Sequence, residues 1–202
     1  MDKHQSKTAF SFRNKVLIAL VILVPVIGLG ILAAVRGLSQ KPLDDLGEVP
    51  AFTLTNQDGS EIKRESFRGT VWVAAFIFTH CDAQCPLIVQ TLKKVSDDVS
   101  EGKWKIVGIS LDPLRDTPEQ LQHFSAHHEL KAERWTLLTG PADLIQNLIA
   151  DGFRVSGRVN EGTHTAYLVL VDRDAHIRGY YDSNDAQRID RLKQDLRRLM
   201  KP

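Results

Sequence analysis

The sequence contains the apolar run Val71-Trp72-Val73-Ala74-Ala75-Phe76-Ile77-Phe78, which passes directly into Thr79-His80-Cys81-Asp82-Ala83-Gln84-Cys85-Pro86. A short, unbroken apolar run is typical of a strand that is covered on both faces. Two cysteines follow it, four positions apart, and a helical pattern begins at Pro86. In open α/β sheets, functional groups gather where a central strand ends and a helix begins. This stretch therefore predicts both a buried central strand and the place of the functional site.

Extended and helical patterns alternate on both sides of this strand. Asn56-Gln57-Asp58-Gly59 is a hairpin turn signal, and Thr117-Pro118-Glu119-Gln120 has the residues of a helix start. We expect strands at 52–55, 61–63, 71–78, 104–110, 135–138, 166–171 and 177–181, and helices at 86–99, from Thr117, at 141–150 and at 186–200. Such alternation with a final hairpin predicts an α/β fold, a mixed central sheet flanked by helices. The pattern alone does not select among folds of this kind.

The N-terminal part predicts a membrane anchor. The chain has 202 residues, 43% hydrophobic and 25% charged, which fits one globular domain plus such an anchor. Residues 16–35 contain no charged side chain, and a helix of that length reaches about 30 Å, the thickness of a hydrocarbon core. The residues that end this run form a poor signal-peptidase site, which favours an uncleaved transmembrane helix. We expect a cytoplasmic N-terminus at 1–15, an anchor at 16–35, a linker at 36–50 and a domain at 51–202.

Charge placement predicts the orientation of this anchor. Four basic side chains precede the span, and positive charge stays in the cytoplasm. We therefore expect a single-pass protein of the bacterial inner membrane, with its domain in the periplasm. The formal net charge of the chain is +1, but residues 37–202 carry 21 basic and 24 acidic side chains. This mildly acidic part argues against binding of nucleic acid.

Cys81 and Cys85 are the only cysteines in the chain. Their spacing places two sulfurs on one face of a helical turn, where they can form a disulfide or hold one metal ion. A purely stabilising disulfide would close a very short loop, so its entropic gain would be small. The pair is therefore predicted to be functional.

A metal site on two sulfurs calls for a nitrogen donor. His164 precedes the strand expected at 166–171, in a loop that would face the cysteine turn in a thioredoxin-like sheet, and a solvated loop histidine is the alternative. His80 is adjacent to Cys81 and is a second candidate. The other histidines have simple interpretations: His4 lies before the anchor, His123, His127 and His128 lie on a polar helical face, and His176 lies in a solvated turn.

Four stretches, in order, resemble the Sco/SenC family of copper chaperones. They are Phe76 to Pro86 with its C-x-x-x-C-P pattern, Ser110 to Glu119 with S-x-D-P-x-R-D-T-P-E, Leu138-Thr139-Gly140, and His164 to Asp172. The similarity runs from about Phe52 to Tyr181 and also includes the position of the anchor.

The resemblance implies a thioredoxin-like fold that binds copper through Cys81, Cys85 and His164. It also implies a role in assembling the dinuclear copper centre of cytochrome c oxidase. The partners would be the copper-receiving subunit of the oxidase and a copper donor or thiol reductant. Thiolates suit Cu(I), and thiolate with imidazole suits Cu(II). Asp82 and Thr163 depart from the family, which often has proline and aspartate there, and a carboxylate beside a ligating histidine helps to orient it.

The rival hypothesis is a thiol–disulfide oxidoreductase that acts on cysteines of the oxidase or of other extracytoplasmic proteins. Cys81 and Cys85 would then be its redox-active pair. Enzymes of this kind usually have C-x-x-C and a cis-proline opposite. The C-x-x-x-C spacing and Thr163-His164 at the proline position favour a metallochaperone, with a reductase activity as the alternative.

Overall fold

The computed structural model describes residues 18, 20–30, 42–80, 84–155 and 166–201. They belong to two compact units, Met1–Pro42 and Leu43–Pro202. In the first unit, residues 20–30 are helical, and their side chains are exposed. Among the described residues, no helix is long and apolar enough to cross a membrane. The predicted span, 16–35, lies only partly within the described residues, so the anchor stays a prediction.

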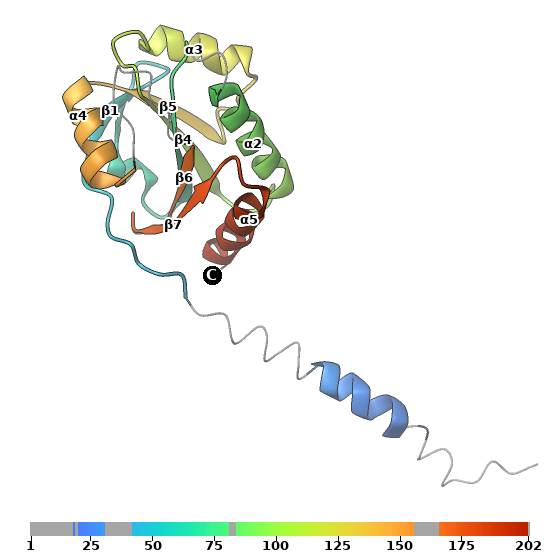
Figure 1. The fold of residues 1–202 in the computed structure, drawn as a ribbon. Coiled ribbons are helices and arrows are strands. Elements are labelled where there is room, and N and C mark those ends of the chain that lie inside the picture. The colour runs from blue at the N-terminus through green and yellow to red at the C-terminus, as the bar shows by residue number, and fades with distance from the viewer. Residues whose placement is uncertain (1–17, 19, 31–41, 81–83, 156–165, 202) are drawn as a thin grey trace, which may run out of the picture. The chain divides into compact units, whose positions relative to one another are not determined.

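A seven-stranded mixed sheet forms the centre of the second unit, in the order β2-β1-β5-β4-β3-β6-β7 (Figure 1). The strands β3, β4 and β5 are parallel, and the other neighbouring strands pair antiparallel. Their bounds are β1 (Thr53–Asn56), β2 (Glu61–Lys63), β3 (Val71–Ile77), β4 (Trp104–Ser110), β5 (Trp135–Thr139), β6 (Tyr167–Val171) and β7 (Ile177–Asp182). The predicted mixed sheet is confirmed.

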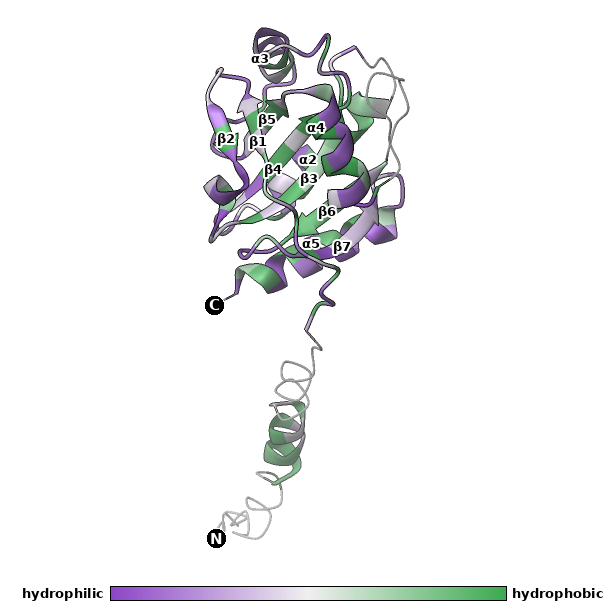
Figure 2. Cartoon of the chain, turned by 90° about the vertical axis from the view of Figure 1, so that its left-hand side faces the viewer, coloured by the Kyte–Doolittle hydropathy of each residue, from purple (hydrophilic) through white to green (hydrophobic). Residues whose placement is uncertain are grey.

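Within the described residues of this unit, four helices and two shorter turns flank the sheet. They are α2 (Gln84–Asp98), α3 (Pro118–His127), α4 (Ala142–Asn147), α5 (Ala186–Met200), a 3₁₀ turn at Arg64–Phe67 and a π-helical turn at Leu148–Gly152. Figure 1 shows α2 and α5 against one face of the sheet and α4 on the opposite face. Every residue of β3 is buried, as the apolar run predicted, and Figure 2 shows the central strands in the colour of hydrophobic residues.

The predicted turn and helix-start signals act locally as expected. The Asn56 side chain accepts hydrogen bonds from the backbone N–H groups of Asp58 and Ser60, at 3.0 and 2.8 Å, and so closes the β1–β2 hairpin. The Thr117 hydroxyl accepts from Gln120 N–H at 3.3 Å, with Pro118 in the first helical position. These bonds satisfy groups that the turn and the helix end would otherwise leave unpaired.

Two boundaries differ from the sequence prediction. Helix α2 begins at Gln84 rather than at Pro86, so Cys85 belongs to its first turn. A proline is tolerated there because the first N–H groups of a helix have no partner within the helix. The helix predicted at 141–150 is regular only to Asn147 and then widens, because Phe153 N–H reaches back five residues to Leu148 O at 2.8 Å.

The described part of the predicted linker packs on the domain. Leu46 N–H donates to Ile177 O at 2.9 Å, and Ile177 N–H donates to Gly47 O at 2.8 Å, so the chain runs beside the start of β7. Val49 is fully buried. His176, expected in a solvated turn, is instead paired with Asp45 through Nδ1, at 3.0 Å from Oδ1. Residues 43–49, here called the strap, therefore form part of the folded unit.

The strap should become less protected as the pH rises. The hydrogen bond with Asp45 raises the pKa of His176, and the same bond lowers the pKa of Asp45. The stabilisation by His176 is fully present below its ordinary pKa of 6.5 and is lost as the pH rises through its raised pKa. The contribution of Asp45 is lost only in strong acid. Protection factors for the amides of Leu46 and Ile177, measured by hydrogen exchange, should fall as the pH rises above 6.5 and through the raised pKa of His176.

Asp45→Asn is the matched control, because an asparagine keeps an acceptor for Gly47 N–H, which Asp45 Oδ1 binds at 3.0 Å, but carries no charge. Its protection factors should be lower at pH 6 and should change less with pH. Identical pH profiles for the wild type and this variant would contradict the assignment of the ion pair.

Candidate metal centre

Cys85 is the predicted ligand that the structure describes. It is 1% exposed, and its Sγ accepts a hydrogen bond from the backbone N–H of Phe78 at 3.5 Å. Phe78 follows the last residue of β3, so the sulfur lies where the central strand ends and α2 begins. The amino-terminal end of a helix favours negative charge, which suits a thiolate. Cys81 and His164 lie outside the described residues, and the structure does not test their place in the site.

Asp116 organises the chain immediately before the cysteine pair. It is fully buried, and its Oδ1 accepts from the hydroxyl of Thr79 at 2.6 Å and from Thr79 N–H at 3.1 Å. Its Oδ2 accepts from the hydroxyl of Ser110, also at 2.6 Å. Thr79 follows β3 and Ser110 ends β4, so one carboxylate joins the carboxyl ends of the two central parallel strands. The position of Thr79, two residues before Cys81, is fixed by this contact.

Asp112 and Asp116 both lie between β4 and α3, but they have different roles. Asp112 stabilises the turn, because its backbone O accepts from Asp116 N–H at 2.8 Å and its carboxylate pairs with Arg115. Asp116 does not cap α3, which is the role of Thr117. Sequence reasoning missed its link to Thr79, because nothing local relates two residues that are 37 positions apart. The signal in the sequence was the position of Asp116 directly before Thr117. Capping α3 needs only the Thr117 side chain, which leaves the Asp116 carboxylate to accept from another group.

The histidines of this region outside the predicted site are either exposed or packed against a neighbouring side chain. His123 and His127 are exposed on α3, as expected. The ring of His128 packs on Phe124 with centroids 4.4 Å apart, and burial lowers its pKa, with smaller effects of His127 and Lys93. His80 is exposed, and its Nδ1 lies 3.0 Å from the hydroxyl oxygen of Thr79. Among the described residues, no group of three His, Cys, Asp or Glu side chains is arranged to hold a metal ion.

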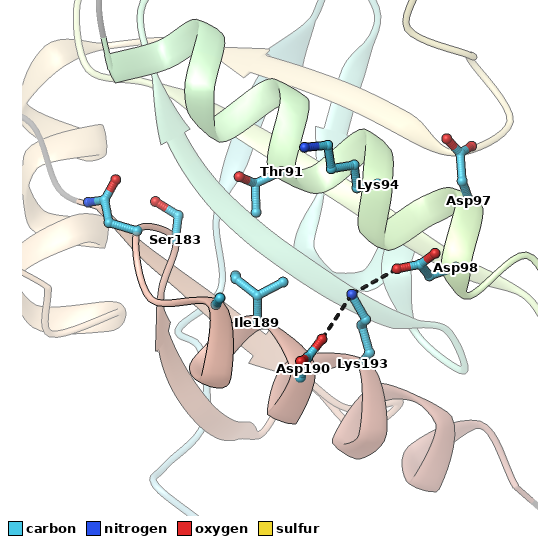
Figure 3. Close-up of a pocket in the computed structure, with 10 residues that line it drawn as sticks. Thr91, Lys94, Asp97, Asp98, Ser183, Ile189, Asp190 and Lys193 are labelled. Carbon is cyan, nitrogen blue, oxygen red and sulfur yellow. Dashed lines mark hydrogen bonds and ion pairs between the residues drawn. The ribbon is translucent and has the colours of Figure 1, made fainter.

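An open groove between α2 and α5 has a different character. Its central cation, Lys193, is already paired with Asp98 at 2.7 Å and with Asp190 at 3.1 Å (Figure 3). The lining residues are Thr91, Lys94, Asp97, Asp98, Ser183, Asn184, Ala186, Ile189, Asp190 and Lys193. Asp98 ends α2, about 20 Å along the helix from Cys85 at 1.5 Å per residue. The paired charges of this groove do not extend the cysteine site.

Three exposed apolar side chains mark the edge of the sheet where Cys85 lies. They are Leu87, Leu114 and Tyr167, with exposed fractions of 54, 76 and 46%. Leu87 is in the first turn of α2, Leu114 follows β4, and Tyr167 begins β6, which runs antiparallel to β3. In the described part of the second unit these are the exposed large hydrophobic residues. This edge thus combines a soft donor with an apolar surface, and the name apolar rim is used below for these three residues.

Comparisons with known proteins agree with this arrangement. The family model described as SCO1/SenC matches residues 41–201, a range that contains both cysteines and His164. A SCO1 protein homologue of Bacillus subtilis is 32% identical over 162 residues, which are 74% of this chain and 81% of that protein.

Solved structures share the fold. BsSco, described as a member of the Sco family of cytochrome c oxidase assembly proteins with a disulfide switch, superposes with a TM-score of 0.72 at 29% identity, over 80% of this chain and 99% of its own. ScoI of Bradyrhizobium japonicum, solved with copper bound, gives a TM-score of 0.59 at 25% identity, over 76% of this chain and 99% of its own. The sheet and its helices are therefore those of Sco proteins.

Replacing Asp116 should destabilise the domain strongly. Asp116→Ala leaves two hydroxyl groups and one N–H without their acceptor, and an unpaired buried polar group is costly. We expect the free energy of unfolding in urea to fall by about 3 kcal/mol. Asp97→Ala, at an exposed position of α2, is the control and should change it by less than about 0.5 kcal/mol. Equal effects of the two variants would contradict the structural role of Asp116.

Proposed function

The chain belongs to the SCO1/SenC family, and on that premise we propose that it is a membrane-anchored copper chaperone. Copper is its cargo, bound by Cys81, Cys85 and His164. It delivers copper for the assembly of the dinuclear copper centre of cytochrome c oxidase. The observation that carries the proposal is a buried cysteine sulfur at the start of α2, in a chain whose relative from Bradyrhizobium japonicum was solved with copper bound.

The donor chemistry supports copper as the metal. Cysteine thiolates are soft ligands that suit Cu(I), and the addition of an imidazole suits Cu(II). Cys85 lies at the positive end of the α2 dipole, which favours the thiolate form that binds metal. The second thiolate is Cys81, four residues earlier, and the nitrogen is His164. Three ligands from two segments leave room for a ligand of the receiving protein.

The apolar rim supports delivery to a protein rather than to a small molecule. Transfer of a tightly held soft metal requires that the receiving ligands approach the sulfurs directly. Leu87, Leu114 and Tyr167 are exposed at this edge, and such side chains lose contact with water when a partner covers them. We assign this edge to the copper-receiving subunit of the oxidase. A copper donor or a thiol reductant would use the same edge in the preceding step.

A thiol–disulfide reductase is the second candidate function. The disulfide switch is described for BsSco, which shares the fold at 29% identity. In this chain the same pair, Cys81 and Cys85, would exchange electrons with cysteines of the oxidase. The two functions differ in their need for His164, since disulfide exchange requires only the sulfurs.

The anchor is part of the proposal. Residues 16–35 carry no charge, and the described helical residues 20–30 expose their apolar side chains. The basic residues that precede them favour a cytoplasmic N-terminus and a periplasmic domain in a bacterium.

The reduced protein should bind one copper ion per chain. Cys81→Ser and Cys85→Ser should each abolish tight binding, because a hydroxyl is a poor ligand for a soft metal. Copper content after desalting, measured by atomic absorption, decides this. Thr91→Ser on α2 is a control that should retain copper. Full retention of copper by both cysteine variants would exclude the proposed site.

His164→Ala should weaken the binding of Cu(II) more than that of Cu(I). Two thiolates satisfy Cu(I), whereas Cu(II) prefers a nitrogen donor and a fuller shell. The absorption band from thiolate to Cu(II) should shift, while formation of the Cys81–Cys85 disulfide should be nearly unchanged. Titrations with Cu(I) and Cu(II), beside a thiol assay, measure all three. Unchanged Cu(II) binding would favour the reductase instead.

The mature chain should remain in the membrane fraction with its N-terminus intact. A fusion of alkaline phosphatase to the C-terminus should be active, because this enzyme folds only outside the cytoplasm. Recovery of a soluble chain that begins beyond residue 35 would show that the segment is a cleaved signal.

A further inference from the structure

A chain of hydrogen bonds connects the buried Asp116 to the exposed His80. The Thr79 hydroxyl lies 2.6 Å from Asp116 Oδ1 and 3.0 Å from His80 Nδ1. Asp116 is fully buried, and His80 is exposed beside Cys81. The bonds from Asp116 to Thr79 and Ser110 already explain how the strand ends are joined. The additional contact with His80 is not needed for that purpose.

Counting protons fixes the direction of this chain. A carboxylate accepts only, so Thr79 must donate its single hydroxyl proton to Asp116. The hydroxyl oxygen can then only accept from the imidazole, which places a proton on His80 Nδ1. In a neutral imidazole the other nitrogen, Nε2, then carries the lone pair. A buried acid thus selects the tautomer of an exposed histidine through one hydroxyl group.

We propose that Asp116 is a positioning residue that acts through Thr79 to present His80 Nε2 as a transient copper ligand during loading and release. The inference rests on the proposed function. A histidine that binds metal commonly donates its second nitrogen to an acceptor that fixes the ring, and Thr79 fills that role here. His80 follows Thr79 and directly precedes Cys81 in the sequence.

The role is kinetic, because His80 binds only while the metal changes hands. As copper arrives or departs, a bond from His80 Nε2 forms while a bond to a ligand of the donor or recipient breaks. The oxidation state of the metal stays the same, and no proton leaves Nδ1. An interaction made only in the transition state changes rates in both directions and leaves the equilibrium constant unchanged. This distinguishes His80 from the resident ligands Cys81, Cys85 and His164.

The test compares rates with affinities in the full chain. Cu(I) is transferred from the loaded protein to a chelator that changes colour on binding. His80→Ala should slow this transfer about tenfold, in line with the effect of losing a supporting group at a metal site, with an unchanged Kd and Cu(II) spectrum. Thr79→Val should slow it in the same direction, and Thr79→Ser should restore the wild-type rate, since serine keeps the hydroxyl. His123→Ala, an exposed histidine on α3, is the matched control and should transfer at the wild-type rate.

A second readout follows the tautomer without copper. Nitrogen-15 NMR of the metal-free protein should show His80 protonated at Nδ1 in the wild type and in Thr79→Ser, and mixed tautomers in Thr79→Val. Wild-type transfer rates for His80→Ala would overturn the proposal, and so would a weakened equilibrium Kd, which would make His80 a resident ligand. Failure of the wild type to bind copper would instead refute the proposed function. The NMR result then still decides whether Asp116 positions His80.

Discussion

The buried carboxylate of Asp116 is the constraint on which the site depends. Strands β3 and β4 are parallel neighbours, so their carboxyl ends meet at one edge, where polar backbone groups would be left without partners. Asp116 accepts from the backbone N–H and the hydroxyl of Thr79 after β3 and from the hydroxyl of Ser110 at the end of β4, so one side chain joins the two strand ends. A buried charge is retained only where several donors compensate for its lost hydration. The strand ends are therefore held rigidly just before the segment that contains the two cysteines.

The contacts of Asp116 explain how the proposed metal site can lie at the end of such a hydrophobic strand. All of β3 is buried, and the strand supplies no polar side chain of its own. The functional groups therefore begin only after Ile77, with Thr79, and continue into the first turn of α2 with Cys85. After Ile77 the next two backbone N–H groups no longer pair within the sheet: Phe78 N–H donates to the Cys85 sulfur, and Thr79 N–H donates to Asp116. Only a few residues of the chain thus separate the rigid, buried strand β3 from the cysteine sulfur.

The strap is a second segment that is held in place by contacts between residues far apart in the sequence. Residues 43–49 make two kinds of contact with the domain. One is backbone pairing beside β7, and the other is the ion pair between Asp45 and His176. Arg154 adds a hydrogen bond from its guanidinium to Leu46 O at 3.0 Å. Residues that the sequence assigned to a linker are thus held on the domain.

The sequence by itself determined the class of fold and the family, and it supplied the candidate residues of the site. The apolar run of β3, the turn at Asn56 and the cap at Thr117 are local signals, and each acts over a few residues, so they can be interpreted without a structure. Four short motifs, which occur in order along the chain, identified the family. Only the tertiary structure decided how Asp116 is used and that the strap is docked. These depend on pairs of residues up to 131 positions apart, such as Asp45 and His176. Such pairs are brought together by the folding of the sheet, and no local preference records them.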